Sequence, residues 1–180
     1  MTRVVGDQPG PPPDPDQAWH VLTLVNEWIK HAETKATGVL AAAGVGAGVL
    51  ATVLATVKAA PLYLIASAVM TGTTLLLSGI CATWCLRPKL WSTGPSTSKI
   101  YFDHIARGYP AAGSGLARYV DELTLLTTDP VAMTREVASQ VWENARIASA
   151  KHIAASWGLT LVLLAYMALA ITAVAAGRIA

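Results

Sequence analysis

The chain has 180 residues, of which 53% are hydrophobic and 13% are charged. Soluble domains usually carry about 25% charged residues, so this composition indicates a small helical membrane protein without a large soluble catalytic domain. The net charge of +2, from 13 basic and 11 acidic residues, is too small to indicate nucleic acid as a partner.

Residues 1–16 combine a Pro-Gly cluster with one basic residue, Arg3. The segment has no apolar core of the kind that a secretory signal peptide needs, and the first apolar run begins too late and continues too long for cleavage. We therefore expect a disordered, partly polyproline tail.

Residues 17–35 predict an amphipathic cytosolic helix. Asp14 or Asp16 can cap its start, and Pro15 is tolerated in the first turn. The apolar residues recur at steps of three and four: Leu22, Val25, Trp28, Ile29 and Ala32. The helix either lies against the bilayer and the other cytosolic helices or takes part in sensing a ligand. No breaker separates it from the apolar run that follows.

Three stretches contain no Asp, Glu, Lys, Arg or His: residues 36–57, 59–86 and 153–176, with lengths of 22, 28 and 24. A helix rises about 1.5 Å per residue, so each stretch is long enough to cross a hydrocarbon core of about 30 Å. The short connection from Lys58 to Pro61 places the first two spans in an antiparallel hairpin. The predicted fold class is an all-α membrane protein with three transmembrane helices.

Small residues in the spans indicate close helix packing. Gly44 and Gly48 form a G-x-x-x-G pair in the first span, and Gly72 lies in the second. This spacing lets helix backbones approach closely in lipid, where the partner is either a second subunit or a neighbouring span. We expect a homo-oligomer. Cys81 and Cys85 are interpreted as packing residues, because two thiols without histidine make a poor metal site.

The distribution of basic residues predicts the orientation. Eleven of the 13 basic residues lie before the first span or within residues 87–152, whereas Lys58 and Arg178 lie at the opposite ends of the spans. The positive-inside rule therefore places the N-terminus and residues 87–152 in the cytosol and the C-terminus outside the inner membrane. Trp84 and Trp91 flank the end of the second span, as expected at an interface.

The cytosolic region between the second and third spans is expected to be helical. We predict three helices: 99–107, capped by Ser96 or Ser98; 116–127; and 130–176, capped by Asp129. The last would be a rod of about 70 Å, partly in water and partly in lipid. A change at its cytosolic end would therefore have a stiff route into the bilayer.

The sequence offers no recognisable catalytic residues. It lacks a phosphate loop, a dinucleotide fingerprint and an H-E-x-x-H motif, and the neighbours Asp103 and His104 point in different directions on a helix. We therefore expect a protein that is not an enzyme and that needs no metal or cofactor. Uncharged spans also argue against a pump or coupled transporter, which leaves a receptor, a channel-like or bilayer-disrupting assembly, or an anchor.

Several cytosolic polar residues are candidates for binding a small anionic ligand. They are Glu33, Lys35, Tyr101, Asp103, His104, Arg146 and Lys151. Lysine and arginine supply charge-assisted hydrogen bonds to a phosphate, and tyrosine or histidine can stack on a base. Alternatively, Lys35 and Lys151 extend to lipid phosphates, because each stands just before a span.

Three motifs in order give the chain a family resemblance. They are Trp28-Ile29 with Ala32-Glu33-Thr34-Lys35-Ala36, then Tyr101-Phe102-Asp103-His104-Ile105, then Gln140-Val141 with Ala148 and Lys151. The chain thereby resembles the transmembrane effectors of the Pycsar antiphage system from about Trp19 to Ala176. Glu33 stands where the family usually has Asp.

The resemblance implies a partner cyclase that makes cyclic UMP or cyclic CMP on infection. It also implies an effector that disrupts the inner membrane, so that the infected cell stops growing or dies before phage are released. With no β-rich nucleotide-binding domain in the sequence, we expect the ligand site to be built from cytosolic helices, between subunits. The alternatives are a membrane anchor that recruits a cytosolic partner and a constitutive small channel.

Overall fold

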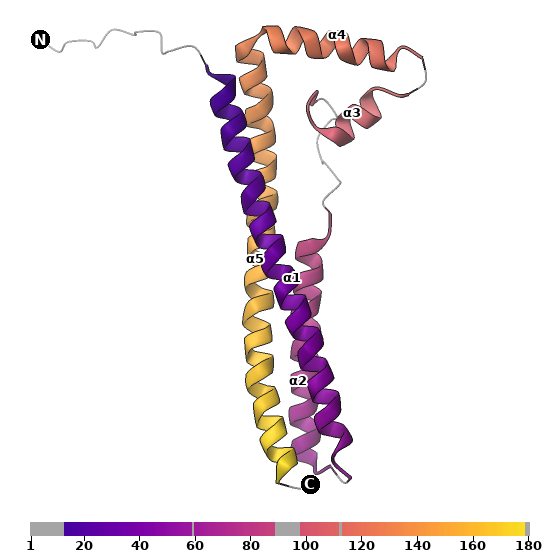
Figure 1. Ribbon diagram of the computed structural model, residues 1–180, viewed down its shortest axis with the longest axis vertical. Helices are drawn as coiled ribbons and strands as arrows, with labels where there is room; N and C mark the ends of the chain where they lie inside the picture. Colours follow the sequence, from indigo (N-terminus) through magenta and orange to yellow (C-terminus); the bar gives the residue numbers. More distant parts are fainter. Residues whose placement is uncertain (1–12, 59, 89–97, 112, 179–180) are drawn as a thin grey trace, which may run out of the picture. The chain divides into compact units, whose positions relative to one another are not determined.

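The computed structural model describes residues 13–58, 60–88, 98–111 and 113–178, and these form helices and no β-strand. The helices are α1 (Pro15–Ala55), α2 (Leu62–Leu86), α3 (Phe102–Gly108), α4 (Gly115–Thr128) and α5 (Pro130–Gly177) (Figure 1). Three of them, α1, α2 and α5, are long and apolar enough to cross a membrane, which confirms the predicted fold class. Most of the predicted tail, together with Trp91 and Ser96, lies outside the described residues.

The chain divides into two compact units. The span unit consists of Val25–Lys89 and Asn144–Ala180, and the α3–α4 unit consists of Met1–Leu24 and Leu90–Glu143. Helices α1 and α5 contribute residues to both units.

The two longest helices begin at a proline that follows an aspartate cap. The Asp14 carboxylate accepts a hydrogen bond from the backbone N–H of Asp16 at 3.0 Å, so Asp14 is the cap of α1. The Asp129 carboxylate accepts hydrogen bonds from the N–H groups of Val131 and Ala132 at 2.9 and 3.1 Å, as predicted for the start of α5. These bonds satisfy N–H groups that have no partner within the first turn of a helix.

The connection between α1 and α2 is longer than the sequence predicts. Helix α1 ends at Ala55, because the N–H groups of Thr56 and Val57 bond to carbonyls three residues back, in a tighter turn. Helix α2 begins at Leu62, directly after Pro61. The first two spans still form an antiparallel hairpin (Figure 1).

Helix α3 begins at Phe102, later than the predicted start at Lys99. Tyr101 has extended backbone angles, and the N–H of Lys99 donates to Glu136 Oε1 at 2.8 Å instead of entering a helix. Ser98 does not cap the helix, since its hydroxyl oxygen accepts a hydrogen bond from the side-chain amide of Gln140 at 3.1 Å. Tertiary partners on α5 therefore displace the start of this short helix.

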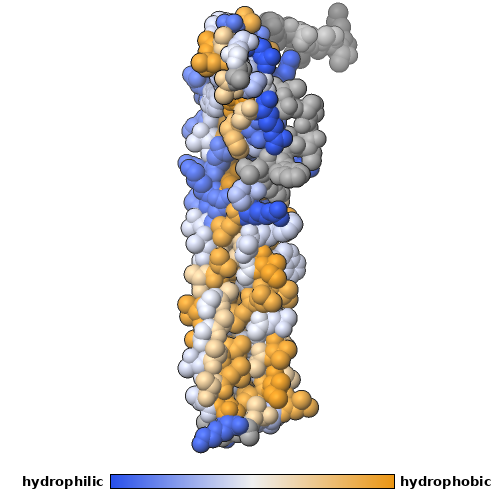
Figure 2. All heavy atoms as spheres, turned by 90° about the vertical axis from the view of Figure 1, so that its right-hand side faces the viewer, coloured by the Kyte–Doolittle hydropathy of each residue, from blue (hydrophilic) through white to orange (hydrophobic). Residues whose placement is uncertain are grey.

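The span unit has a core of small side chains. Its buried members come from all three long helices: Ala32, Ala36, Val39, Ala43, Leu75, Ala82, Cys85, Ala155, Val162 and Ala165. Between 22% and 33% of the most apolar window of each long helix is buried, so most of these apolar residues face outward. Figure 2 shows hydrophobic side chains along one face of the spans, as expected for a surface in contact with lipid.

Hydrogen bonds also cross between helices inside the spans. They join the Ser78 hydroxyl to the Gly158 carbonyl (2.8 Å), the Tyr166 hydroxyl to the Ala42 carbonyl (3.0 Å), and the hydroxyls of Thr71 and Thr172 (3.3 Å). Such bonds contribute about 0.6 kcal/mol each on average in a membrane protein. Thr74 and Thr83 instead donate to carbonyls of their own helix, four residues back.

Candidate functional site

Three helices of the span unit meet at a buried lysine. Lys151 of α5 is 5% exposed, and its ammonium group donates hydrogen bonds to Glu33 Oε1 of α1 and to the Cys85 carbonyl of α2, both at 2.6 Å. The Cys85 Sγ lies 3.6 Å from the Ala32 carbonyl. We call Lys151, Glu33 and the Cys85 carbonyl the polar brace.

The polar brace matches each charge to a partner. The Cys85 carbonyl lies in the last turn of α2, where carbonyls have no partner within the helix and the helix dipole favours a cation. The ammonium of Lys151 supplies that cation, and the carboxylate of Glu33 balances its charge. Lys151 therefore does not extend to lipid phosphates, and its side chain holds α1, α2 and α5 together.

The other two basic candidates lie on exposed helix faces of the same unit. Lys35 lines a groove of about 690 Å³ between α1 and α5, together with His152 and Ser156. Arg146 is exposed on α5 and has interactions of its own. Of the candidates in the span unit, the structure brings Glu33 and Lys151 into direct contact.

The remaining candidates lie together in the α3–α4 unit. His104 is 9% exposed, and its Nδ1 accepts a hydrogen bond from the N–H of Ser98 at 3.2 Å. The Tyr101 ring packs edge-on against His104, with 5.0 Å between ring centroids. Asp103 points elsewhere, since its carboxylate binds Arg107 one turn later at 3.0 Å. Tyr101 and His104 therefore form a pair, and Asp103 serves an ion pair within α3.

The second nitrogen of His104 has no partner in the described part of the chain. Its Nε2 is buried and makes no hydrogen bond. In a neutral imidazole whose Nδ1 accepts a hydrogen bond, Nε2 carries the proton. A buried donor without a partner costs about 1–3 kcal/mol, so the position is favourable for an incoming acceptor oxygen. Burial also raises the pKa of the neighbouring Tyr101 hydroxyl.

A network of charged and aromatic side chains holds the rest of the α3–α4 unit. The Tyr109 hydroxyl donates to Glu122 at 2.7 Å, and the Lys99 ammonium lies 3.4 Å from the same carboxylate. Arg118 stacks over the Tyr109 ring at 5.0 Å and donates to the Gly108 carbonyl. The hydrogen bond from Tyr109, followed by the nearby cations, lowers the pKa of Glu122.

The glycines of the first span divide into two kinds. A Cβ atom placed on Gly44 or Gly48 would meet nothing within 4 Å, whereas one on Gly46 would lie 2.9 Å from Leu75 Cδ2. The contact between α1 and α2 therefore uses Gly46, and the G-x-x-x-G pair does not pack on another span of the described chain. Gly72 lies against Leu50, with 3.6 Å between its Cβ position and Cδ2.

Sequence reasoning missed residues whose role depends on tertiary partners. The Gln140 amide binds Ser98 next to His104, and Gly158 lies where α1, α2 and α5 approach one another. Gln140 belongs to the third family motif, but that motif does not indicate a bond to Ser98, and Gly158 stands alone in the third span without a spacing motif. Within the described residues, no cluster of three or more His, Cys, Asp or Glu side chains lies close enough to hold a metal ion.

Comparison with known proteins identifies two matches. A family model described as the Pycsar effector protein domain matches residues 17–177. The Pycsar effector protein PtPycTM of Propioniciclava tarda is 30% identical over 158 residues, which cover 87% of this chain and 77% of that protein. No solved structure matches the chain.

Proposed function

This chain belongs to the Pycsar effector protein family, and from that premise we propose that a cyclic pyrimidine nucleotide switches it into a form that impairs the inner membrane. The family confirms the resemblance in the sequence and assigns the chain an effector role in Pycsar antiphage defence. The nucleotide, cyclic UMP or cyclic CMP, is made by a partner pyrimidine nucleotide cyclase. The effector itself is not an enzyme, and its action stops the growth of the infected cell.

The orientation that we propose puts the sensing region where the nucleotide is made. The N-terminus and residues 87–152 lie in the cytosol, and the C-terminus lies outside. This assignment is supported by the 11 basic residues at one end of the spans, of the 13 in the chain.

The observation that supports nucleotide sensing is the buried Nε2 of His104. We propose that an oxygen of the nucleotide accepts this hydrogen bond. A carbonyl oxygen at position 2 of the ring is common to uracil and cytosine, and aromatic rings such as Tyr101 can stack on a base. Because Nε2 is closed off from solvent, the α3–α4 unit has to open for the ligand to enter.

The polar brace supplies an element that can be rearranged. In the resting form it ties α1, α2 and α5 together at one end of the spans. A ligand can shift this packing only by binding one arrangement more tightly than the other. We propose that nucleotide binding favours an arrangement in which the brace is broken and the spans repack.

The repacked form is a homo-oligomer in this proposal. Gly44 and Gly48 have open space around them, although close helix approach in lipid is favoured at such glycines. A second subunit can therefore approach α1 at this face.

The test is to express the protein with its partner cyclase in cells that carry a membrane-potential dye. We expect the potential to collapse when the nucleotide is made, and to persist in His104→Ala although that variant is inserted normally. His20→Ala, which changes an exposed histidine on α1, is the matched control and should behave as wild type. An unchanged potential after confirmed nucleotide synthesis would refute the proposal.

The same experiment separates the two alternatives. A membrane anchor would leave the potential unchanged and would retain a cytosolic partner in a pull-down. A constitutive channel would lower the potential without any cyclase.

A further inference from the structure

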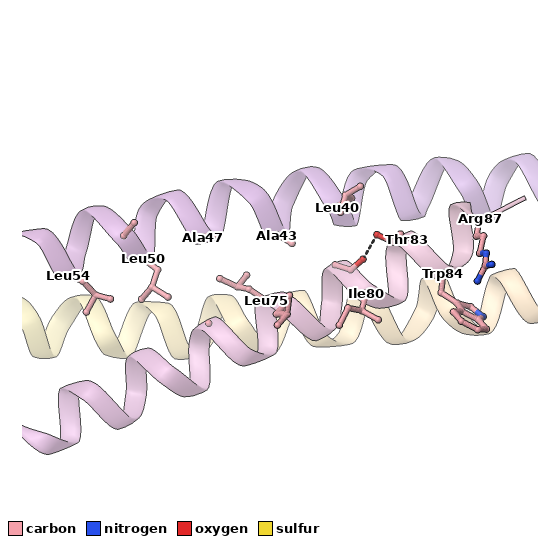
Figure 3. A pocket seen from close by; sticks show the side chains of 14 residues that line it. Leu40, Ala43, Ala47, Leu50, Leu54, Leu75, Ile80, Thr83, Trp84 and Arg87 are labelled. Atoms are coloured by element: carbon pink, nitrogen blue, oxygen red, sulfur yellow. Dashed lines mark hydrogen bonds between the residues drawn. The ribbon is translucent and has the colours of Figure 1, made fainter.

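An apolar groove of about 740 Å³ runs along the outside of the span unit between α1 and α2. Its floor is made of small residues, including Ala43, Ala47 and Gly79, and its walls carry larger side chains such as Leu50 and Leu54. Figure 3 shows these side chains along both helices. From Leu40 to Leu54 the groove follows α1 for 15 residues, which span about 21 Å at a rise of 1.5 Å per residue.

The groove has a charge at one end. Of the 14 lining residues, Arg87 alone is charged, and it lies beside Trp84 at the end away from Leu54 (Figure 3). Thr83 is the polar residue in the wall, and its hydroxyl donates to the Gly79 carbonyl at 2.8 Å. The groove is therefore apolar along its length and cationic at one end.

Among the described residues, the Arg87 guanidinium forms none of the ion pairs that join the helices. Arg87 ends α2, where its backbone N–H donates to the Thr83 carbonyl, but the neighbouring Cys85 carbonyl is bound by Lys151. No carboxylate forms an ion pair with Arg87 in the residues that the structure describes. Trp84 is 63% exposed, as expected for an indole at a membrane interface.

We propose that this groove binds one acyl chain of an anionic membrane phospholipid, whose phosphate is held by Arg87. Half of a hydrocarbon core of about 30 Å is shorter than the groove, so an extended chain of one leaflet fits its length. Arginine holds phosphate through paired N–H groups, and the indole of Trp84 lies at head-group level. The site is separate from the nucleotide proposal and does not depend on it.

Charge rather than apolar area should decide which lipid binds. An acyl chain leaves equally apolar surroundings when it enters the groove, so the groove supplies shape and little net affinity. A cation near the membrane surface is worth about 1 kcal/mol toward anionic lipid, which corresponds to a preference of roughly fivefold. We therefore expect phosphatidylglycerol to bind about five times as well as phosphatidylethanolamine.

Native mass spectrometry of the full chain in detergent, with each of these two lipids added, tests the site. Arg87→Gln should lower phosphatidylglycerol binding by about fivefold. Ala47→Leu, which fills the floor, should lower the binding of both lipids. Arg178→Gln, an arginine at the opposite end of the spans, should leave binding unchanged. If Ala47→Leu disturbs folding by circular dichroism, Ala51→Leu provides the same test farther along the groove.

Equal binding of the two lipids, or full binding by Arg87→Gln, would overturn the proposal. A second copy of the chain is the rival occupant of the groove. A disulfide-linked dimer that forms through Ala47→Cys, above the background from Cys81 and Cys85, and that binds no lipid would assign the groove to that copy. Such a result would overturn the lipid site and leave the nucleotide-triggered function standing.

Discussion

Replacing Lys151 by methionine tests the polar brace most directly. The side chain is 5% exposed and makes two hydrogen bonds of 2.6 Å, while methionine keeps most of its apolar stem. Loss of the ammonium leaves the Cys85 carbonyl without its partner, at a cost of about 1–3 kcal/mol. Glu33 is 39% exposed, so water can replace its partner and the ion pair itself adds only about 0–1 kcal/mol. We expect a loss of about 2 kcal/mol of folding free energy.

The assay is reversible unfolding of the purified protein in detergent micelles, followed by circular dichroism. Lys35→Met removes an exposed lysine from α1 and is the matched control, with an expected change within about 0.5 kcal/mol. Glu33→Gln should cost less than Lys151→Met, because Lys151 then keeps its bond to the Cys85 carbonyl. Equal losses in Lys151→Met and Lys35→Met would refute the reasoning.

Two further predictions concern packing and pH. Gly158→Val should destabilise the bundle by about 1–3 kcal/mol in the same assay, because the Cβ position lies 3.2 Å from Val39 Cγ1. Gly44→Val is the control, because no atom lies within 4 Å of its Cβ position, and it should not lower the stability of the single chain. Equal losses of stability in Gly158→Val and Gly44→Val would contradict the packing account. The hydrogen bond from Tyr109 is the main cause that lowers the pKa of Glu122 from its usual 4.5. The stability that this pairing contributes is therefore fully present above pH 4.5. It is lost as the pH falls through the lowered pKa. Thermal melts between neutral and acid pH should therefore show a steeper loss of stability for wild type than for Tyr109→Phe, and parallel losses would contradict the assignment.

The spans and the starts of the long helices could be predicted because local sequence determines them. Uncharged stretches of 22 or more residues have few structures available to them in lipid other than a helix. The Asp129 side chain caps the helix, and the Pro130 ring favours the backbone angles of its first position. Helix α5 begins at that proline. The start of α3 could not be predicted in this way, because Lys99 and Ser98 are held by partners on α5.

The sequence predicted which residues belong to the candidate site, but it did not predict which of them contact one another. Charge and position drew attention to Glu33 and Lys151, but they are separated by 118 residues in sequence, and their contact depends on which helix faces meet. The same holds for the glycines of the first span. The G-x-x-x-G spacing indicated Gly44, whereas the packing against α2 uses Gly46. His104 was a candidate for its chemistry, whereas the lack of a partner at Nε2 follows only from the folded environment.

Release of an encapsulated dye from liposomes that contain the purified protein, oriented with residues 87–152 outward, tests the central claim most directly. We expect cyclic UMP or cyclic CMP to trigger release, while the corresponding linear nucleotide does not, and His104→Ala to abolish the response. Liposomes that stay sealed although the cyclic nucleotide is bound, or that leak equally without it, would contradict a nucleotide-triggered membrane effector.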